Sequence, residues 1–315
     1  MSASMRVGMA NGVAAGALWG VVFLAPAVLM TFTAVQLSAG RYLFYGAIAL
    51  VLLAPRWRAL APRLQAAEWR GLVWLSLAGN LVYFLLLATA VQWAGGAAAS
   101  LIVGLVPVLV TLVGAREAGA VPLRRLAPSL LLCLCGVALV GYEALVSEAV
   151  STPWRQRVLG LLCALGALLS WAVYSVGNSR WLARRPDLSA HDWSLLTGVV
   201  TGALALLLVP AAFLLPGAAH PPGQWAVFWS ISAGVAVIAS LVGNGCWNRA
   251  SRLLPLTLTA QMIVFETLFA LAYGFAWQGR WPTLLEAIAI VCLIAGVLLC
   301  ARAHRAPAAV AEHAG

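Results

Sequence analysis

Residues 16–23 read Gly-Ala-Leu-Trp-Gly-Val-Val-Phe, and residues 166–174 read Gly-Ala-Leu-Leu-Ser-Trp-Ala-Val-Tyr. Each stretch lies inside an apolar segment long enough to cross a bilayer, whose hydrocarbon core takes about 20 residues of helix. Because self-similarity at a fixed spacing is the signature of a repeated architecture, we interpret the two stretches as corresponding parts of two repeats.

Apolar segments of this kind fill the chain of 315 residues. Hydrophobic residues make up 63% of it and charged residues only 9%, with a mean hydropathy of +0.97. No soluble domain of this size buries so much apolar surface. The sequence therefore predicts an all-α integral membrane protein. We expect ten transmembrane helices, near residues 8–30, 34–54, 70–92, 96–115, 126–146, 158–180, 193–215, 224–247, 254–277 and 283–301.

The repeat unit is five spans long. Each half ends in a similar glycine-containing helix, Cys135-Gly-Val-Ala-Leu139 in the first and Ala295-Gly-Val-Leu-Leu299 in the second. We place the first repeat at residues 1–150 and the second, with a short cytoplasmic tail, at 151–315. An odd number of spans makes the second half enter the membrane from the other side. Two inverted five-helix repeats around a central cavity are typical of secondary transporters, whose substrate site lies near the midplane.

The net charge of +10 does not by itself indicate a nucleic-acid partner. The chain has nineteen arginines and no lysine, and the arginines form no patch, so we expect no nucleic-acid partner. Without lysine there is no P-loop, whose phosphate-binding lysine is essential to the motif. We expect no hydrolysis of ATP, and nothing in the sequence indicates an ATPase subunit.

The arginines also predict the orientation, because cytoplasmic loops retain them during insertion. With the N-terminus in the cytoplasm, only Arg41, Arg155, Arg157 and Arg280 fall at the outer ends of spans. The fifteen at the inner ends are Arg6, Arg56, Arg58, Arg63, Arg70, Arg116, Arg124, Arg125, Arg180, Arg184, Arg185, Arg249, Arg252, Arg302 and Arg305. We predict a multi-pass protein of a bacterial inner membrane with both termini in the cytoplasm.

Four short motifs occur in a fixed order: Leu18-Trp19-Gly20, Gly40-Arg41-Tyr42, Pro107 with Glu117 ten residues later, and Ser170-Trp171-Ala172 with Tyr174. Their order and spacing resemble the drug/metabolite transporter superfamily, specifically its ten-helix EamA-type members. The resemblance covers nearly the whole chain and is greatest to exporters of aromatic amino acids. It implies ten helices around a cavity and transport of small metabolites, often outward.

Span nine departs from the pattern of that family. Phe265-Glu266-Thr267 stands where such proteins commonly carry a proline, and Gln278 stands where an acidic residue is common. Glu266 falls near the middle of the span, where an ionised carboxylate costs about 2.5–3.5 kcal/mol. One interpretation is that it lines the cavity and receives the amino group of a solute or exchanges a proton. The other is a protonated side chain that joins two helices through a hydrogen bond to a neighbouring residue and serves only packing.

Polar and aromatic residues three, four and seven positions apart share a helix face. Aromatic walls with a few amides and one carboxylate suit an amino acid with a flat side chain, or an organic cation held by cation-π contacts. For Trp19 and Trp171, tight packing is the alternative to lining the path. The candidate solute-binding residues are Trp19, Asn80, Tyr83, Trp171, Tyr174, Asn178, Asn244, Gln261 and Glu266.

Small residues and prolines predict how the helices pack and bend. Gly8, Gly12, Gly16 and Gly20 form a face that lets another helix come close. We interpret this face as a contact inside one chain rather than a dimer interface, and expect a monomer. Pro107 removes a backbone hydrogen bond within span four, and we expect it to be a hinge for alternating access.

Other function classes have less support. The four histidines, His191, His220, His304 and His313, lie in loops or in the tail, so we expect neither an enzyme nor a cofactor or metal site. No ring of repeated charges or carbonyl-presenting glycine signature indicates a channel.

Arg41 lies at the mouth of span two. Two roles are open for its side chain there: drawing a carboxylate solute, or snorkelling to the lipid headgroups. We predict a secondary transporter that exports small metabolites by alternating access, foremost amino acids including aromatic ones. The alternatives are a multidrug, organic-cation or other metabolite transporter of the same fold, and after these a channel.

Overall fold

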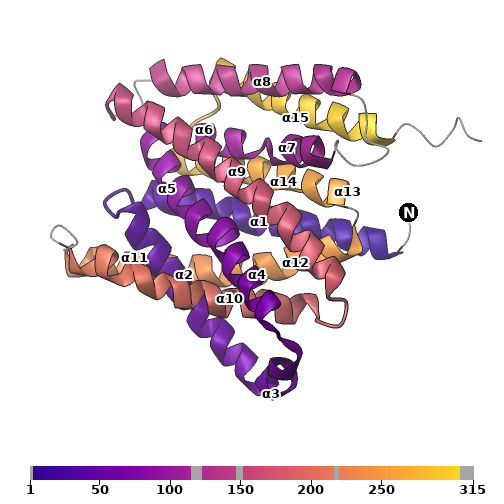
Figure 1. Cartoon of the computed structure of the whole chain (residues 1–315). Helices are drawn as coiled ribbons and strands as arrows, with labels where there is room; N and C mark the ends of the chain where they lie inside the picture. Colours follow the sequence, from indigo (N-terminus) through magenta and orange to yellow (C-terminus); the bar gives the residue numbers. More distant parts are fainter. Residues whose placement is uncertain (1–2, 115–122, 147–151, 216–219, 255, 306–315) are drawn as a thin grey trace, which may run out of the picture.

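Helices make up nearly all of the computed structural model, which describes residues 3–114, 123–146, 152–215, 220–254 and 256–305 (Figure 1). Eight helical stretches are long and apolar enough to cross a membrane, and two shorter apolar ones are Gly96–Val110 and Leu284–Leu299. These ten segments follow the ten expected spans, so the all-α membrane fold is confirmed. Glu117 lies outside the described residues.

The first five spans run as follows: α1 (Ala3–Val28); α2 (Ala34–Leu53); α4 (Ala66–Ser76), η3 (Leu77–Leu81) and α5 (Val82–Ala94); α6 (Gly96–Val103) and α7 (Val106–Gly114); and α8 (Leu123–Val146). Between spans two and three the chain forms η1 (Ala54–Arg56), α3 (Trp57–Leu60) and η2 (Ala61–Arg63). The last five are α9 (Trp154–Arg184); α10 (Ala190–Ala205), η4 (Leu206–Leu208) and η5 (Pro210–Leu214); α11 (Pro222–Val235), η6 (Ala236–Gly243) and α12 (Asn244–Leu253); α13 (Leu256–Gln261) and α14 (Ile263–Gln278); and α15 (Leu284–Arg305).

Corresponding spans of the two halves are irregular at corresponding places. Spans three and eight each contain a π-helical segment, η3 and η6. Spans four and nine are each divided, at Gly104–Leu105 and at Met262. Pro107 accounts for the first division, since a proline ring clashes with the carbonyl of the residue four positions earlier. The second division occurs at a position without a proline. There, Met262 N donates to Thr259 O and Phe265 N donates to Met262 O, so these hydrogen bonds join residues three positions apart instead of the four of an α-helix.

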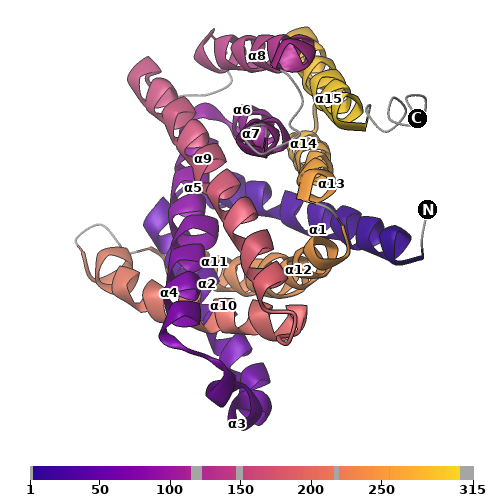
Figure 2. The ribbon, with the colours of Figure 1, turned by 45° about the vertical axis from the view of Figure 1, so that its right-hand side comes forward.

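The contacts between spans recur when each span is replaced by its counterpart in the other half, spans one to five corresponding to spans six to ten. Span three packs on span six through α5 and α9, and span eight packs on span one through α12 and α1. Span nine contacts span one, and span four contacts span six. The pairs α8–α15 and α2–α10 lie at opposite edges of the bundle, at the top and the bottom of Figures 1 and 2. This arrangement is that of two inverted five-helix repeats.

The glycine face of span one is covered from within the chain. A Cβ added at Gly12 would lie 2.5 Å from Met262 Cγ, and one added at Gly16 would lie 2.8 Å from the backbone nitrogen of Glu266. Gly20 meets Ala270 in the same way. Span nine therefore occupies this face, as expected for a contact inside one chain, and the close approach of backbones positions Glu266 beside span one.

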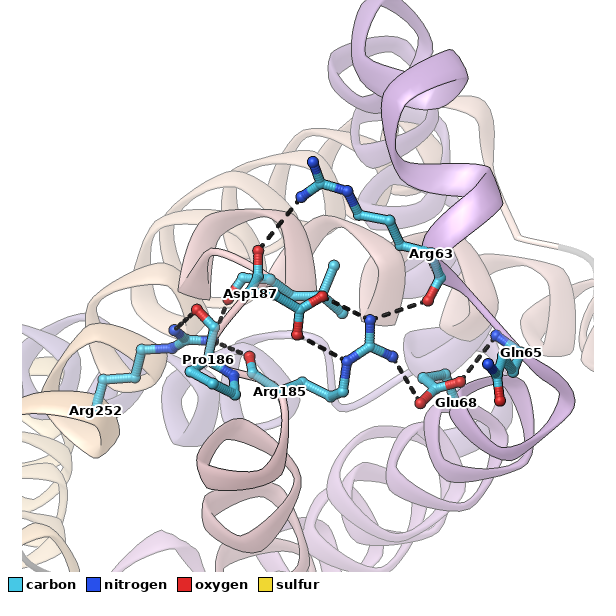
Figure 3. A network of polar contacts seen from close by, with 8 residues as sticks. Arg63, Gln65, Glu68, Arg185, Pro186, Asp187 and Arg252 are labelled. Atoms are coloured by element: carbon cyan, nitrogen blue, oxygen red, sulfur yellow. Dashed lines mark hydrogen bonds and ion pairs between the residues drawn. The ribbon is translucent and has the colours of Figure 1, made fainter.

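Charged side chains connect the loops at one end of the bundle (Figure 3). Arg185, which follows α9, forms an ion pair of 2.7 Å with Glu68 of α4 and donates hydrogen bonds of 2.9 and 2.8 Å to Asp187. Its guanidinium also donates to the carbonyl of Arg63, at 2.9 Å. Arg252, at the end of α12, donates to the carbonyls of Arg185 and Leu188. Arg63, Arg185 and Arg252 were expected at the same side of the membrane, and the structure gathers them at one end.

Candidate functional site

The irregular parts of spans three, eight and nine surround a pocket near the middle of the bundle. Its free space is about 10 Å³, close to what one water molecule needs. The pocket is therefore closed in this conformation. It is lined by Trp19, Val22, Arg41, Gly79, Asn80, Tyr83, Trp171, Asn244 and Glu266, which come from six spans.

Aromatic rings form one wall of the pocket. The centroids of Trp19 and Trp171 are 5.0 Å apart in an edge-to-face arrangement, and Trp247 lies 5.2 Å from Trp19. Tyr83 and Tyr174 lie 4.8 and 4.7 Å from Trp171. Such contacts are worth about 0.5–1.5 kcal/mol each beyond the area they bury. The two tryptophans at matching repeat positions therefore form the centre of this wall.

Two of the three indole N–H groups in this wall have no hydrogen-bond partner among the described residues. Trp19 Nε1 donates to the carbonyl of Ala239 in η6, at 3.0 Å. Within the described part of the chain, Nε1 of Trp171 and of Trp247 is buried without a hydrogen-bond acceptor. Buried donors without partners are rare in native proteins and call for an explanation, such as a ligand or an ordered water.

Glu266 is 2% exposed and lies in the first turn of α14. The positive end of a helix dipole favours a carboxylate there. Tyr83 Oη donates to Glu266 Oε1 at 3.4 Å, whereas Oε2 has no partner among the described residues. The bond to Tyr83 is compatible with both interpretations of Glu266, the solute-binding carboxylate and the hydrogen-bonded packing residue.

Arg41 lies deeper in the bundle than the mouth of span two, where the sequence places it with two roles open. It is 5% exposed and lines the pocket instead of reaching the headgroups. Its Nε donates to Ser240 Oγ of η6 at 2.9 Å, and its guanidinium lies 4.5 Å from the centre of the Phe84 ring. Arg41 occupies the second turn of α2, so its side chain starts within the bundle and packs between spans. Its depth in the span is the signal that the outer-end assignment overlooked.

The two pocket amides are already bonded to neighbouring spans. Asn80 Nδ2 donates to Thr201 Oγ1 at 3.0 Å, which joins span three to span seven. Asn244 Nδ2 donates to Tyr45 Oη at 3.4 Å, which joins span eight to span two. These bonds fix the scaffold around the pocket that the two residues line.

The structure brings six of the nine predicted residues to the pocket: Trp19, Asn80, Tyr83, Trp171, Asn244 and Glu266. Tyr174 stacks behind Trp171 and does not line the free space. Asn178 bonds with Asn248 and Trp193 elsewhere along span six. Gln261 ends α13 and is not among the lining residues. Trp247, which is not among the nine predicted residues, belongs to the aromatic wall.

In the described ranges, no three His, Cys, Asp or Glu side chains gather closely enough to hold a metal ion. The pocket contains one basic and one acidic side chain within an aromatic enclosure. Together with ten spans in two inverted halves, this is the arrangement of a membrane transporter for small molecules.

The chain belongs to the EamA-like transporter family. The model of that family matches residues 158–302. The chain is also 33% identical over 309 residues to the inner membrane protein YtfF of Escherichia coli (strain K12), covering 95% of this chain and 96% of that protein. A solved structure titled "Crystal structure of protein" shares the fold, with a TM-score of 0.64 and 19% sequence identity. The match covers 95% of this chain and 98% of that chain. The family consists of transporters rather than enzymes.

Proposed function

We propose that the protein exports amino acids, including aromatic ones, across the bacterial inner membrane by alternating access. The observation that carries this proposal is the closed pocket between the two halves, which Glu266 lines together with aromatic rings and in which its Oε2 has no partner among the described residues. A flat side chain fits against Trp19 and Trp171, and a carboxylate accepts hydrogen bonds from an ammonium group. The similarity to an inner membrane protein supports the location.

Several further features belong to the same proposal. Both termini lie in the cytoplasm, and the repeats meet near residue 150, between α8 and α9. The protein acts as a monomer, because the glycine face of span one is covered by span nine of the same chain. Trp19, Asn80, Tyr83, Trp171, Asn244 and Glu266 border the solute, with Tyr174, Asn178 and Gln261 in supporting positions.

Organic cations are the second candidate class, favoured by the aromatic wall and Glu266. Cation-π contacts hold quaternary ammonium groups in aromatic enclosures. Arg41 in the same pocket opposes such a solute, because its guanidinium remains protonated. We therefore rank amino acids first.

The test is uptake of labelled phenylalanine into proteoliposomes, with and without an imposed pH gradient, beside the Glu266→Gln protein. We expect the gradient to stimulate uptake and the variant to lose this stimulation. Uptake that ignores the gradient in both proteins would indicate a uniporter. Absence of phenylalanine uptake in the wild type, together with uptake of an organic cation, would favour the second candidate class.

A further inference from the structure

Arg41 presents a buried positive charge whose donors are only partly used. Its Nε bonds to Ser240, and its Nη1 is buried without a hydrogen-bond partner within the described part of the chain. A guanidinium carries five N–H donors and stays charged in proteins. Its place inside a bilayer therefore calls for an anionic or polar group that the described residues do not supply.

The surroundings hold the guanidinium in place. Phe84 and Tyr42 present their rings at 4.5 and 5.0 Å from the guanidinium carbon, and Ser240 fixes Nε from the π-helical segment of span eight. An arginine clamped by cation-π contacts and one hydrogen bond is preorganised, so little side-chain entropy is lost when a ligand arrives. These features are those of a residue that binds a ligand without first changing its conformation.

Glu266 lines the same pocket from span nine, and its Oε2 has no partner among the described residues. None of the ion pairs formed by the described residues includes Arg41 or Glu266. These two are the only basic and acidic side chains of the pocket lining. The pocket thus has a basic pole and an acidic pole, which form no ion pair with each other among the described residues.

We propose that Arg41 binds the carboxylate of the solute while Glu266 faces its amino group, so that the site selects zwitterionic α-amino acids over organic cations. This inference rests on the proposed transport function and names the group that sets its specificity. An α-amino acid carries both charges on one carbon, so it can bridge two poles of one small pocket when the halves part to admit it. Each buried charge then gains an opposite partner, which offsets its desolvation.

Other solutes leave one pole without a partner. An amine alone places a second cation beside Arg41, and like charges in a low-dielectric site repel strongly. A carboxylate alone pairs with Arg41 but meets Glu266 as a second anion unless one of them takes up a proton. A hydrogen-bonding site rejects ligands that lack one of the matching groups, because its buried polar atoms are then left unpaired.

The test is counterflow of labelled phenylalanine in proteoliposomes at pH 7, with three unlabelled competitors that share one ring. Phenylalanine has both charged groups, phenethylamine has only the amine, and 3-phenylpropionate has only the carboxylate. In the wild type we expect each truncated compound to compete at least tenfold more weakly than phenylalanine. Equal competition by phenethylamine would overturn the role of Arg41 while leaving amino-acid transport in place.

Variants assign the carboxylate contact to Arg41. Arg41→Gln should raise the KM for phenylalanine at least tenfold and bring phenethylamine and phenylalanine to within about threefold of each other. Arg41→Lys should restore part of the preference, and Ser240→Ala should raise KM by a smaller factor with kcat retained. Arg58→Gln, at an exposed position outside the pocket, is the matched control. Arg41→Gln protein that elutes and melts like the wild type with an unchanged KM would refute the inference.

The design also separates this inference from the proposed function. If the wild type shows no counterflow of phenylalanine and none of the three compounds raises its melting temperature, amino-acid transport and the role of Arg41 both fail. If phenylalanine is transported but the Arg41 variants keep its preference over phenethylamine, only the role of Arg41 fails.

Discussion

Trp19 and Trp171, 152 positions apart in the sequence, meet edge to face with 5.0 Å between their ring centroids. They come from α1 of the first half and α9 of the second, and each residue lines the central pocket. The contact therefore joins the two halves at the point where the proposed solute binds.

Replacing the ring of Trp171 tests the aromatic wall. In Trp171→Leu, the loss of ring contacts worth about 0.5–1.5 kcal/mol should weaken phenylalanine binding about two- to tenfold. The measurement is the KM for phenylalanine in proteoliposomes. Trp154→Leu, at a ring 66% exposed, should leave KM unchanged. A Trp171→Leu protein with the KM of the wild type would show that the ring serves only packing.

Gly16 sets how closely span one approaches span nine. Because a Cβ there would lie 2.8 Å from the backbone nitrogen of Glu266, Gly16→Ala should destabilise the protein by about 1–3 kcal/mol. Thermal unfolding in detergent measures the effect. At Gly141 an added Cβ meets nothing within 4 Å, so Gly141→Ala should be neutral or stabilising by up to about 1 kcal/mol. Equal melting temperatures for the two variants would contradict the close approach.

Pro107 is expected to maintain the division between α6 and α7. With alanine there, the backbone N–H returns and the two segments can join into one continuous helix. If the division is the hinge for alternating access, Pro107→Ala should lower turnover severalfold with little change in KM. Steady-state transport separates the two quantities. Normal turnover would remove Pro107 from the mechanism. Span nine, which is divided at Met262, shows that such breaks also form where no proline stands.

Asp187 gives a pH dependence at the charged end of the bundle. Hydrogen bonds from Arg185 lower the pKa of Asp187 from 3.8 to about 2. Because the folded-state pKa lies below the ordinary value, the contribution is fully present above pH 4. It is lost as the pH falls toward 2. In Arg185→Gln, we expect the pKa of Asp187 to return toward its ordinary value.

The same variant should also loosen the loops that Arg185 connects. Amide hydrogen exchange in residues 61–68 and 185–189 should accelerate, because Glu68 and the carbonyl of Arg63 lose their donor. Arg155→Gln, at an exposed position in the first turn of α9, is the control. Unchanged exchange in both segments would show that the network does not hold the loops together.

Much of the site was visible in the sequence, and the reasons for the misses are specific. A carboxylate in mid-span and tryptophans at matching repeat positions are costly or unusual in an apolar segment, so Glu266, Trp19 and Trp171 stood out. Gln261 and Asn178 share that polar character but face other neighbours. Helical spacing alone does not say which face meets the centre, because every span of a bundle has several neighbouring helices.

The sequence by itself determined the class of protein, the ten spans and the similarity of the halves. These follow from hydropathy and short motifs, since the bilayer requires every spanning backbone to satisfy its own hydrogen bonds. Only the tertiary structure decided that Arg41 shares a pocket with Glu266, and that span nine divides without a proline. Both depend on how helices distant in the chain pack together, and that packing is governed by the fit of side chains such as Phe84 and Ser240 around a buried charge.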